Sequence, residues 1–362
     1  AVKIAQKHCQ ATVKYFPSAG LVAPWLGKSI EEISKEYVDL MKASEKLPDT
    51  VNIIGQYKEK YCPQRNKKNC KFHDYLDEAE ELTLYVEKLN LKLHRVLISG
   101  GKNYIQTASQ ASVNMISCPT WGYPLVHEMY NKFQIPFGKH SIPMGFESTK
   151  KWILELANLT NRQEKAYKFI EKEYEKVASL TEIIKNSVIG KYALIECGRN
   201  TQTSFARAMA LGRMCHELGM KPLFFNAHPL EIKAKKHDVD YFLYDNFNPE
   251  ILFGPYPYQK PVNLTDITED LNIDLDDFIY FSQDVFPFAK SGVIDVSNAS
   301  KVETSVHLRR IKNSTSRGMG FSGNKSLLKQ IKNSLQTSKR LSKPTLYARI
   351  NGKFFNFYDE NN

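Results

Sequence analysis

The stretch Ser112-Val-Asn-Met-Ile-Ser-Cys118 decides the fold, because it has the pattern of a short buried strand that ends in a cysteine. Pro119-Thr-Trp-Gly122 follows at once and leads into an amphipathic helix over residues 123–133. In a chain that alternates strands and helices, ligands gather in the crevice beyond the carboxyl ends of the strands. Cys118 lies at such an end, so we expect its thiol to carry the function.

Strand and helix patterns alternate on both sides of this stretch. The strands are predicted at 51–55, 94–98, 192–196, 222–225 and 278–281, and a short segment at 136–137 follows the helix that ends near residue 133. The helices between and after them are predicted at 75–89, 104–111, 149–159, 204–218 and 326–335. Repeated β-α-β units are typical of parallel, doubly wound sheets.

This alternation divides the chain into five segments. We predict the end of an amino-terminal domain over 1–48, a Rossmann-like lobe over 49–160, a connecting helix over 161–189, a second Rossmann-like lobe over 190–335 and a tail over 336–362. The connecting segment has no glycine or proline from 161 to 187, so we expect one helix about 40 Å long at about 1.5 Å per residue. The predicted fold class is α/β, with two Rossmann-like (flavodoxin-like) parallel-sheet lobes joined by a long helix.

The composition is that of a globular protein with a basic surface. The formal net charge is +11 at pH 7, which makes nucleic acid a partner to consider. However, the lysines are spread along helix faces, and the chain has no zinc finger, RNA-recognition signature or basic-aromatic repeat. We therefore expect no nucleic-acid partner and interpret the charge as a solvated surface, with acidic partners or anionic substrates as the alternative.

Neither a membrane segment nor a leader is predicted. No run approaches the roughly 18 apolar residues of a membrane span, and the amino end carries no secretory signal. We therefore expect a cytoplasmic protein with no membrane association.

The six cysteines lack the dense spacing of a secreted disulfide framework and are interpreted as reduced. One loop, 57–73, contains Cys62, Cys70 and His73 among six lysines and arginines. The seven residues between the two cysteines do not match the short spacing of zinc or ferredoxin sites, so a basic loop is the first interpretation and a metal site the alternative. Three further cysteines are predicted to be core residues: Cys9, Cys197 and Cys215.

Several short motifs, taken in order, resemble the component 1 proteins of nitrogenase and nitrogenase-like reductases. The motifs are Leu97-Ile-Ser-Gly100, Ala111-Ser-Val-Asn-Met-Ile-Ser-Cys118, Tyr130-Asn-Lys-Phe-Gln-Ile-Pro136, Ile142-Pro-Met-Gly145, Gly198-Arg199, His216-Glu-Leu-Gly-Met220 and Gly320-Phe-Ser-Gly323. The resemblance covers roughly residues 15–335. The cysteine at 118 is similar to the α-type subunits and the cofactor-assembly scaffold, whereas Ile-Pro-Met-Gly is similar to the β-type subunits. The subfamily therefore stays open.

The resemblance implies that Cys118 holds one end of an iron–sulfur-based cofactor between the two lobes. A soft thiolate binds iron well, and bound iron favours the deprotonated thiol. From the residues alone, the alternative is a small buried apolar side chain. His307 has the place of the histidine that ligates the far end of the cofactor in α subunits, although the sequence around it differs from theirs. A strand-end histidine beside two arginines is the alternative.

Three arginines are further candidates for binding the cofactor. Arg199 precedes the helix at 204–218, where backbone N–H groups and a guanidinium make an anion site. The resemblance implies that Arg199 lies near the cofactor and that Arg309 and Arg310 add positive potential for an acidic group. For each of them a surface ion pair is the alternative.

The resemblance also implies a function. It implies a low-potential, multi-electron reductase subunit, or a scaffold for cofactor assembly, whose partners are a homologous component 1 subunit and an ATP-dependent iron protein reductase. Component 1 proteins begin with a domain that holds an electron-relay cluster, and residues 1–22 resemble only the end of it. The alternative from another class is a two-lobed protein that binds metal chelates such as cobalamins or siderophores without catalysis.

Overall fold

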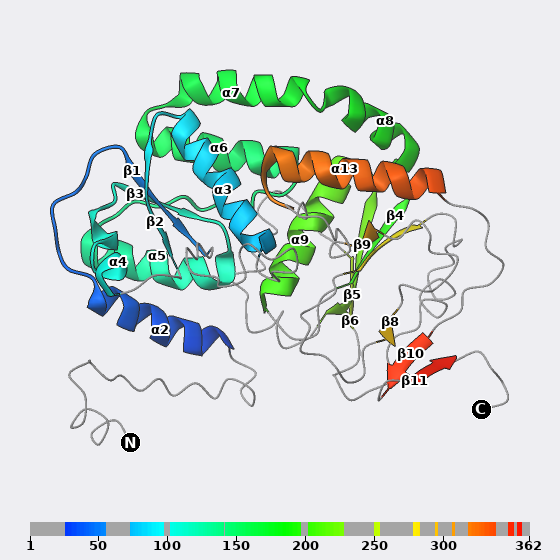
Figure 1. Cartoon of the computed structure of the whole chain (residues 1–362), viewed down its shortest axis with the longest axis horizontal. Helices are drawn as coiled ribbons and strands as arrows, with labels where there is room; N and C mark the ends of the chain where they lie inside the picture. The colour runs from blue at the N-terminus through cyan, green and yellow to red at the C-terminus, as the bar shows by residue number, and fades with distance from the viewer. Residues whose placement is uncertain are drawn as a thin grey trace.

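The structure is a computed structural model of the chain, in which two α/β lobes lie side by side (Figure 1). It describes residues 26–55, 73–97, 102–140, 142–196 and 202–227, followed by 250–253, 278–282, 294–295, 306–307, 318–337, 347–350 and 353–356. No helix in these ranges is both long enough and apolar enough to cross a membrane.

The first lobe is built on a parallel sheet. Its central strand β1 (Thr50–Ile54) lies between β2 (Lys92–Leu97) and β3 (Val113–Ile116), and Phe137 continues the sheet through a parallel bridge to Asn114. In chain order the strands are therefore 2-1-3-4, which is the flavodoxin-like order. The direction of winding changes between β1 and β3, and this switch point is where such folds bind ligands.

Helices cover both faces of this first sheet (Figure 1). In chain order they are α2 (Leu26–Leu40), α3 (His73–Lys88), α4 (Lys102–Gln106), a short 3-10 helix (Ala108–Gln110), α5 (Pro119–Phe133) and α6 (Phe146–Thr160). Because neighbouring side chains of a strand point to opposite faces, Val51 and Ile53 pack with α3 and α6, whereas Ile54 packs with α2 and α5.

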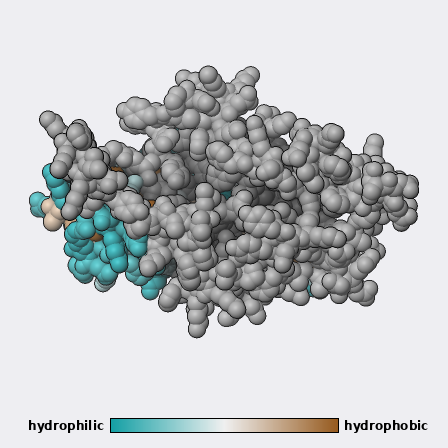
Figure 2. Space-filling model, turned by 90° about the horizontal axis from the view of Figure 1, so that it is seen from below, coloured by the Kyte–Doolittle hydropathy of each residue, from teal (hydrophilic) through white to brown (hydrophobic). Residues whose placement is uncertain are grey.

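Helix α2 shows how one face of a helix is buried and the other is left in water. Its residues Glu31, Lys35 and Asp39 follow one another at four-residue spacing and are exposed, whereas Ile30 and Val38 are buried. From below, the described surface at the left end of the molecule, where α2 lies, is hydrophilic (Figure 2).

The second lobe is built on a five-stranded parallel sheet. Its order is β6 (Glu250–Phe253), β5 (Lys221–Ala227), β4 (Tyr192–Glu196), β7 (Phe278–Ser282) and β9 (Val306–His307). In chain order this is 3-2-1-4-5, the Rossmann order, so the winding changes direction between β4 and β7. Helix α9 (Gln202–Glu217) connects β4 to β5. The predicted α/β class with two parallel sheets is confirmed.

A third, antiparallel sheet includes part of the tail predicted over 336–362. There β10 (Tyr347–Ile350) pairs with β11 (Lys353–Asn356) on one side and with β8 (Ile294–Asp295) on the other. No strand was predicted for these segments. β8 is short and its partner is far away in the sequence, and the Asn351-Gly352 hairpin signal between β10 and β11 was missed.

The connection between the lobes differs from the single helix predicted over 161–189. It consists of α7 (Gln163–Glu175) and α8 (Ala178–Val188), and the chain leaves helical geometry at Val177, where φ is −124° and ψ is −11°. Val177 is itself buried. The break lets α8 turn down from α7 toward the second lobe (Figure 1), so the apolar residues of both helices reach one core.

One apolar core runs through both lobes. A single buried cluster joins Val51 and Ile53 of β1 to Ala193 and Ile195 of β4, by way of residues on α3, α6, α9 and α13 (Gly320–Thr337). Helix α13 also packs on α3, α6 and α8, although its sequence follows the second sheet. The two lobes are therefore packed as one unit. The boundaries at 160 and 190 stay predictions.

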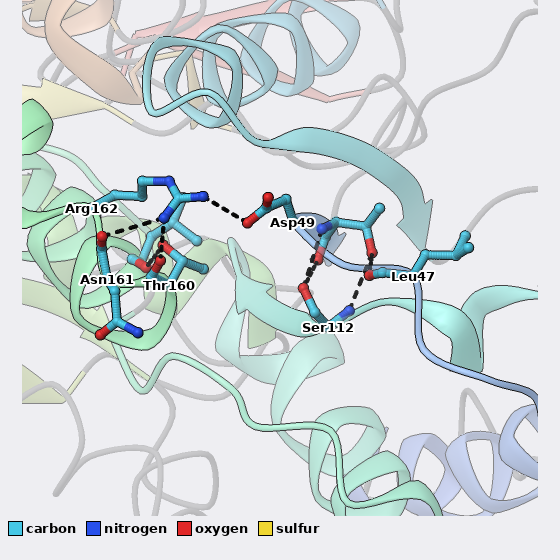
Figure 3. A network of polar contacts seen from close by, with 8 residues as sticks. Leu47, Asp49, Ser112, Thr160, Asn161 and Arg162 are labelled. Atoms are coloured by element: carbon cyan, nitrogen blue, oxygen red, sulfur yellow. Dashed lines mark hydrogen bonds and ion pairs between the residues drawn. The ribbon is translucent and has the colours of Figure 1, made fainter.

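A polar network links the chain segments at the edge of the first sheet where its strands begin (Figure 3). Arg162 donates hydrogen bonds to Asp49 Oδ1 (2.8 Å), Thr160 O (3.1 Å) and Asn161 O (3.4 Å). The two carbonyls belong to the end of α6, so the guanidinium joins that helix end to the start of β1. Beside it, Ser112 Oγ accepts a hydrogen bond from the N–H of Thr50 (3.1 Å).

We expect Arg162→Met to lower the free energy of unfolding by only about 1 kcal/mol, because its partner Asp49 is 52% exposed and water can solvate the carboxylate when the arginine is removed. Urea denaturation at pH 7 measures this change. A loss several times larger would mean that the network supports the sheet and not only its edge.

Candidate functional site

Cys118 lies where the sequence predicts it, at the turn from strand β3 into helix α5. The residue has extended backbone (φ −137°, ψ 117°) and forms the N-cap of α5, with Pro119 as the first residue of the helix. Its carbonyl accepts a hydrogen bond from the N–H of Gly122 (2.7 Å), which closes the first helical turn. The side chain is buried, with the residue 4% exposed.

The strand that carries Cys118 is held from two directions. Ser117 donates both its N–H (2.8 Å) and its hydroxyl (2.9 Å) to the carbonyl of Ile54 at the end of β1. The buried indole of Trp152, on α6, donates to the carbonyl of Ile116 (2.8 Å). The backbone next to Cys118 is therefore fixed before any ligand arrives.

Gly55, the residue after β1, lies directly against Cys118. A Cβ at position 55 would be 2.7 Å from the N atom, 2.8 Å from the Cβ and 2.9 Å from the O atom of Cys118, and the backbone φ of Gly55 is +98°. Both facts require glycine there. The ends of β1 and β3 thus meet at the switch point of the first sheet, and the thiol residue is placed there.

Of the candidates in the second lobe, the structure describes only the backbone of His307. This residue ends β9 and pairs with Ser282 of β7, so it also lies at the carboxyl end of a parallel strand. Arg199, Arg309 and Arg310 lie outside the described residues, as do Cys62 and Cys70. Their roles stay predictions.

The carboxyl ends of the two sheets are linked by an ion pair between Glu78 and Arg207. Helix α3 follows β1 and helix α9 follows β4, so both helices begin at the carboxyl end of the central strand of their sheet. Glu78, near the start of α3, accepts hydrogen bonds from both Nη atoms of Arg207, near the start of α9, and the Nη1–Oε2 distance is 2.9 Å. Sequence reasoning missed both residues, because a lone glutamate and a lone arginine on helices are usually solvent-exposed.

Three of the motifs that carry the family resemblance meet between the lobes. Gly320 donates its N–H to the carbonyl of Pro143 (2.7 Å), and the N–H of Gly145 donates to Oδ1 of Asn324 (2.7 Å). From the third motif, Oε2 of Glu217 accepts a hydrogen bond from the N–H of Glu147 (3.2 Å), in the first turn of α6. The described parts of these motifs therefore join the lobes to each other.

An iron–sulfur-type group needs soft donor side chains, thiolates above all. Within the described ranges, no group of three or more His, Cys, Asp or Glu side chains could hold a metal ion. Neither Cys118 nor Cys215 forms a disulfide there. Burial, followed by the charge of Glu217, raises the pKa of Cys215 far above its ordinary value, so Cys215 is a structural thiol. Cys118 at the switch point is the soft donor that fits such a group.

Fold and site together define a class of two-lobed α/β proteins that have a buried thiol at the switch point of the first sheet. The family model of nitrogenase component 1 type oxidoreductases matches residues 7–229, well over half of the chain. The chain therefore belongs to the nitrogenase component 1 type oxidoreductase family, and the resemblance predicted from the motifs is confirmed. No curated protein matches the sequence.

Two solved structures have the same fold. "Nitrogenase Cp1 at pH 5" has a TM-score of 0.60 and 16% sequence identity, covering 93% of this chain and 67% of that chain. "Nitrogenase Cp1 at pH 6.5" has a TM-score of 0.58 and 12% identity, covering 86% of this chain and 65% of that chain. At these identities the likeness shows the fold alone. The chain spans about two thirds of the length of these proteins.

Proposed function

We propose that this protein is a component 1 type subunit in which Cys118 binds an iron–sulfur-type cofactor for low-potential reduction or for cofactor assembly. The observation that carries the proposal is the thiol at the switch point of the first sheet, in a chain of this family. When bound, such a group supplies electrons at low potential.

The residues of the chain have separate tasks in this proposal. Cys118 is the ligand from the first lobe, and His307 is the proposed second ligand from the end of β9. Arg199, Arg309 and Arg310 are proposed to balance the negative charge of the group. A homologous component 1 subunit and an ATP-dependent iron protein reductase are the proposed partners, and the cytoplasm is the proposed location.

The surroundings of Cys118 suit a ligand that must not move. Burial keeps water away from the sulfur, and the hydrogen bonds of Ser117 and Trp152 hold the strand on either side. A ligand whose backbone is fixed in advance loses little conformational freedom when it binds. These contacts support the proposal because they fix the backbone that places the thiol at the switch point.

Iron analysis of protein purified without oxygen tests the proposal. We expect wild-type protein to be brown and to contain iron and acid-labile sulfide, and we expect Cys118→Ala to reduce bound iron at least about tenfold, because the sulfur is a direct ligand. Cys215→Ala is the matched control, since it removes a buried thiol of α9 that is not at a strand end, and it should keep its iron.

Two results would overturn the proposal. Unchanged iron in Cys118→Ala would show that the thiol only packs. A colourless wild-type protein that binds a cobalamin or a ferric siderophore would favour the two-lobed chelate-binding class.

A further inference from the structure

The ion pair between Glu78 and Arg207 joins a buried carboxylate to a partly buried guanidinium. Two hydrogen bonds, one from each Nη atom to a different carboxylate oxygen, make the fork arrangement that arginine favours. The side chain of Glu78 is 1% exposed and that of Arg207 is 22% exposed. Removing Arg207 would leave the charge of Glu78 buried without its partner, so it should lower the free energy of unfolding more than the loss of a surface ion pair does.

The pair joins helices that belong to different lobes. Glu78 is the sixth residue of α3 and Arg207 is the sixth residue of α9, so each lies in the second turn of its helix. Since the partners are 129 residues apart in sequence, the contact fixes the relative position of two distant helices.

A second layer of residues covers the pair. Gly318 lies next to it, because a Cβ at this position would be 2.5 Å from Cε of Met144, 3.4 Å from Nη2 of Arg207 and 3.8 Å from Oε1 of Glu78. Met144 belongs to the Ile-Pro-Met-Gly motif, and Gly318 precedes α13. Four segments of the chain thus meet at one point: α3, α9, the 142–145 loop and the approach to α13.

We infer that Glu78 and Arg207 are a positioning pair that holds the carboxyl end of the second sheet at a fixed place relative to that of the first. Cys118 follows the strand next to β1, and the proposed second-lobe residues follow strands of the sheet whose centre is β4. The pair therefore sets the span across which a cofactor is held from both lobes. The statement about the cofactor rests on the proposed function, whereas the statement that the pair fixes the relative position of the two sheets does not. In some proteins a buried ion pair or polar group specifies one arrangement of the packed elements.

The test compares Arg207→Met, Arg207→Lys and Arg162→Met. Arg207→Met removes the charge but keeps much of the side-chain length, and Arg207→Lys keeps the charge but loses the fork. Arg162→Met breaks an arginine–carboxylate pair at the opposite end of the first sheet. Leu156→Ala, in the buried core of α6, is a control for loss of stability alone. Hydrogen exchange, iron content and the electron paramagnetic resonance spectrum are measured on each protein.

Hydrogen exchange tests the geometric part whether or not iron is present. In Arg207→Met we expect amides at the starts of α3 and α9 and at the ends of β1 and β3 to exchange at least about tenfold faster than in wild type. In Arg207→Lys these amides should exchange at rates between those of wild type and Arg207→Met. In Arg162→Met their exchange rates should be unchanged. Wild-type exchange at these amides in Arg207→Met would overturn the inference.

Iron tests the part that concerns the cofactor. We expect Arg207→Met to contain at least about fivefold less iron than wild type, because the distance between the ligands of the two lobes is altered. The electron paramagnetic resonance spectrum of the remaining iron should also change. Arg207→Lys should recover part of both. If Leu156→Ala loses as much iron as Arg207→Met, the pair acts only through stability and the inference fails. Iron-free wild type would instead overturn the proposed function, while hydrogen exchange would still decide on the geometry.

Discussion

Gly55→Ala is expected to lower the free energy of unfolding by about 3 kcal/mol or more, because it combines backbone strain with a steric clash. Position 55 has a φ of +98°, which side chains rarely adopt, and the new methyl group would lie 2.7 Å from the main-chain nitrogen of Cys118. The Cys118 atoms that the methyl group would meet are the backbone N and O and the Cβ. These atoms cannot move without the chain, so β1 or β3 must shift. We therefore expect the substitution to displace Cys118 and to reduce iron binding as well as stability.

Gly190→Ala is the matched control for this prediction. Gly190 also has positive φ, +79°, but nothing lies within 4 Å of a Cβ there. It should therefore cost only the strain of the backbone, about 1–2 kcal/mol. Urea denaturation of both variants gives the difference. If the two variants lose the same stability, the close approach of β1 to Cys118 has no energetic consequence and the site is less rigid than described.

Local patterns were sufficient to find most elements of the fold. The strand predicted at 192–196 coincides with β4, because an apolar run between Gly190 and Gly198 has clear limits at both ends. Cys118 was also correctly placed at a strand end, since Pro119 marks where the strand stops and the helix begins.

Contacts between distant segments were not predictable in the same way. The break at Val177 has no glycine or proline to announce it, and it arises because the chain must curve around a core made by both lobes. The pairing of Glu78 with Arg207, and of Gly55 with Cys118, depends on which strands are neighbours. The helices and strands of such a site can be predicted from a single sequence. Which of their residues come into contact depends on the order of the strands in the two sheets.

Glu217 is a further contact of this long-range kind. Its carboxylate comes from the end of α9 in the second lobe and lies at the start of α6 in the first, so close to Gly145 that a Cβ there would be 2.7 Å from Oε1. Burial raises the pKa of Glu217 from 4.5 to about 7. The nearby charge of Glu147 adds to this shift, whereas the backbone N–H groups at 146–148 oppose it without cancelling it.

The raised pKa makes stability depend on pH with a defined sign. Between pH 4.5 and about 7 the folded protein keeps a proton on Glu217 that the unfolded chain releases, so this residue's contribution to stability falls as the pH rises. Above about pH 7 the carboxylate is charged in both states, and the contribution no longer changes. The total loss over this window is about 3 kcal/mol, from about 1.4 kcal/mol per pH unit.

Glu217→Gln is therefore expected to make the protein more stable than wild type by about 2 kcal/mol at pH 8, and to leave stability nearly unchanged at pH 5. The amide keeps a carbonyl oxygen for the N–H of Glu147 but carries no charge into the buried site. Urea denaturation at several pH values measures the effect.

Glu155→Gln is the control of opposite sign. Burial disfavours the charge of Glu155, but hydrogen bonds from His140 and Lys139 outweigh it and hold its pKa below the ordinary value. The charge of Glu155 therefore stabilises the protein at neutral pH, and this stabilisation is lost as the pH falls through the folded pKa, so removing the charge should destabilise the protein at pH 8. If Glu217→Gln is instead less stable than wild type at pH 8, the start of α6 stabilises the carboxylate more than burial penalises it. The contact between the lobes would then be held by the charged form of Glu217 and not by its protonated form.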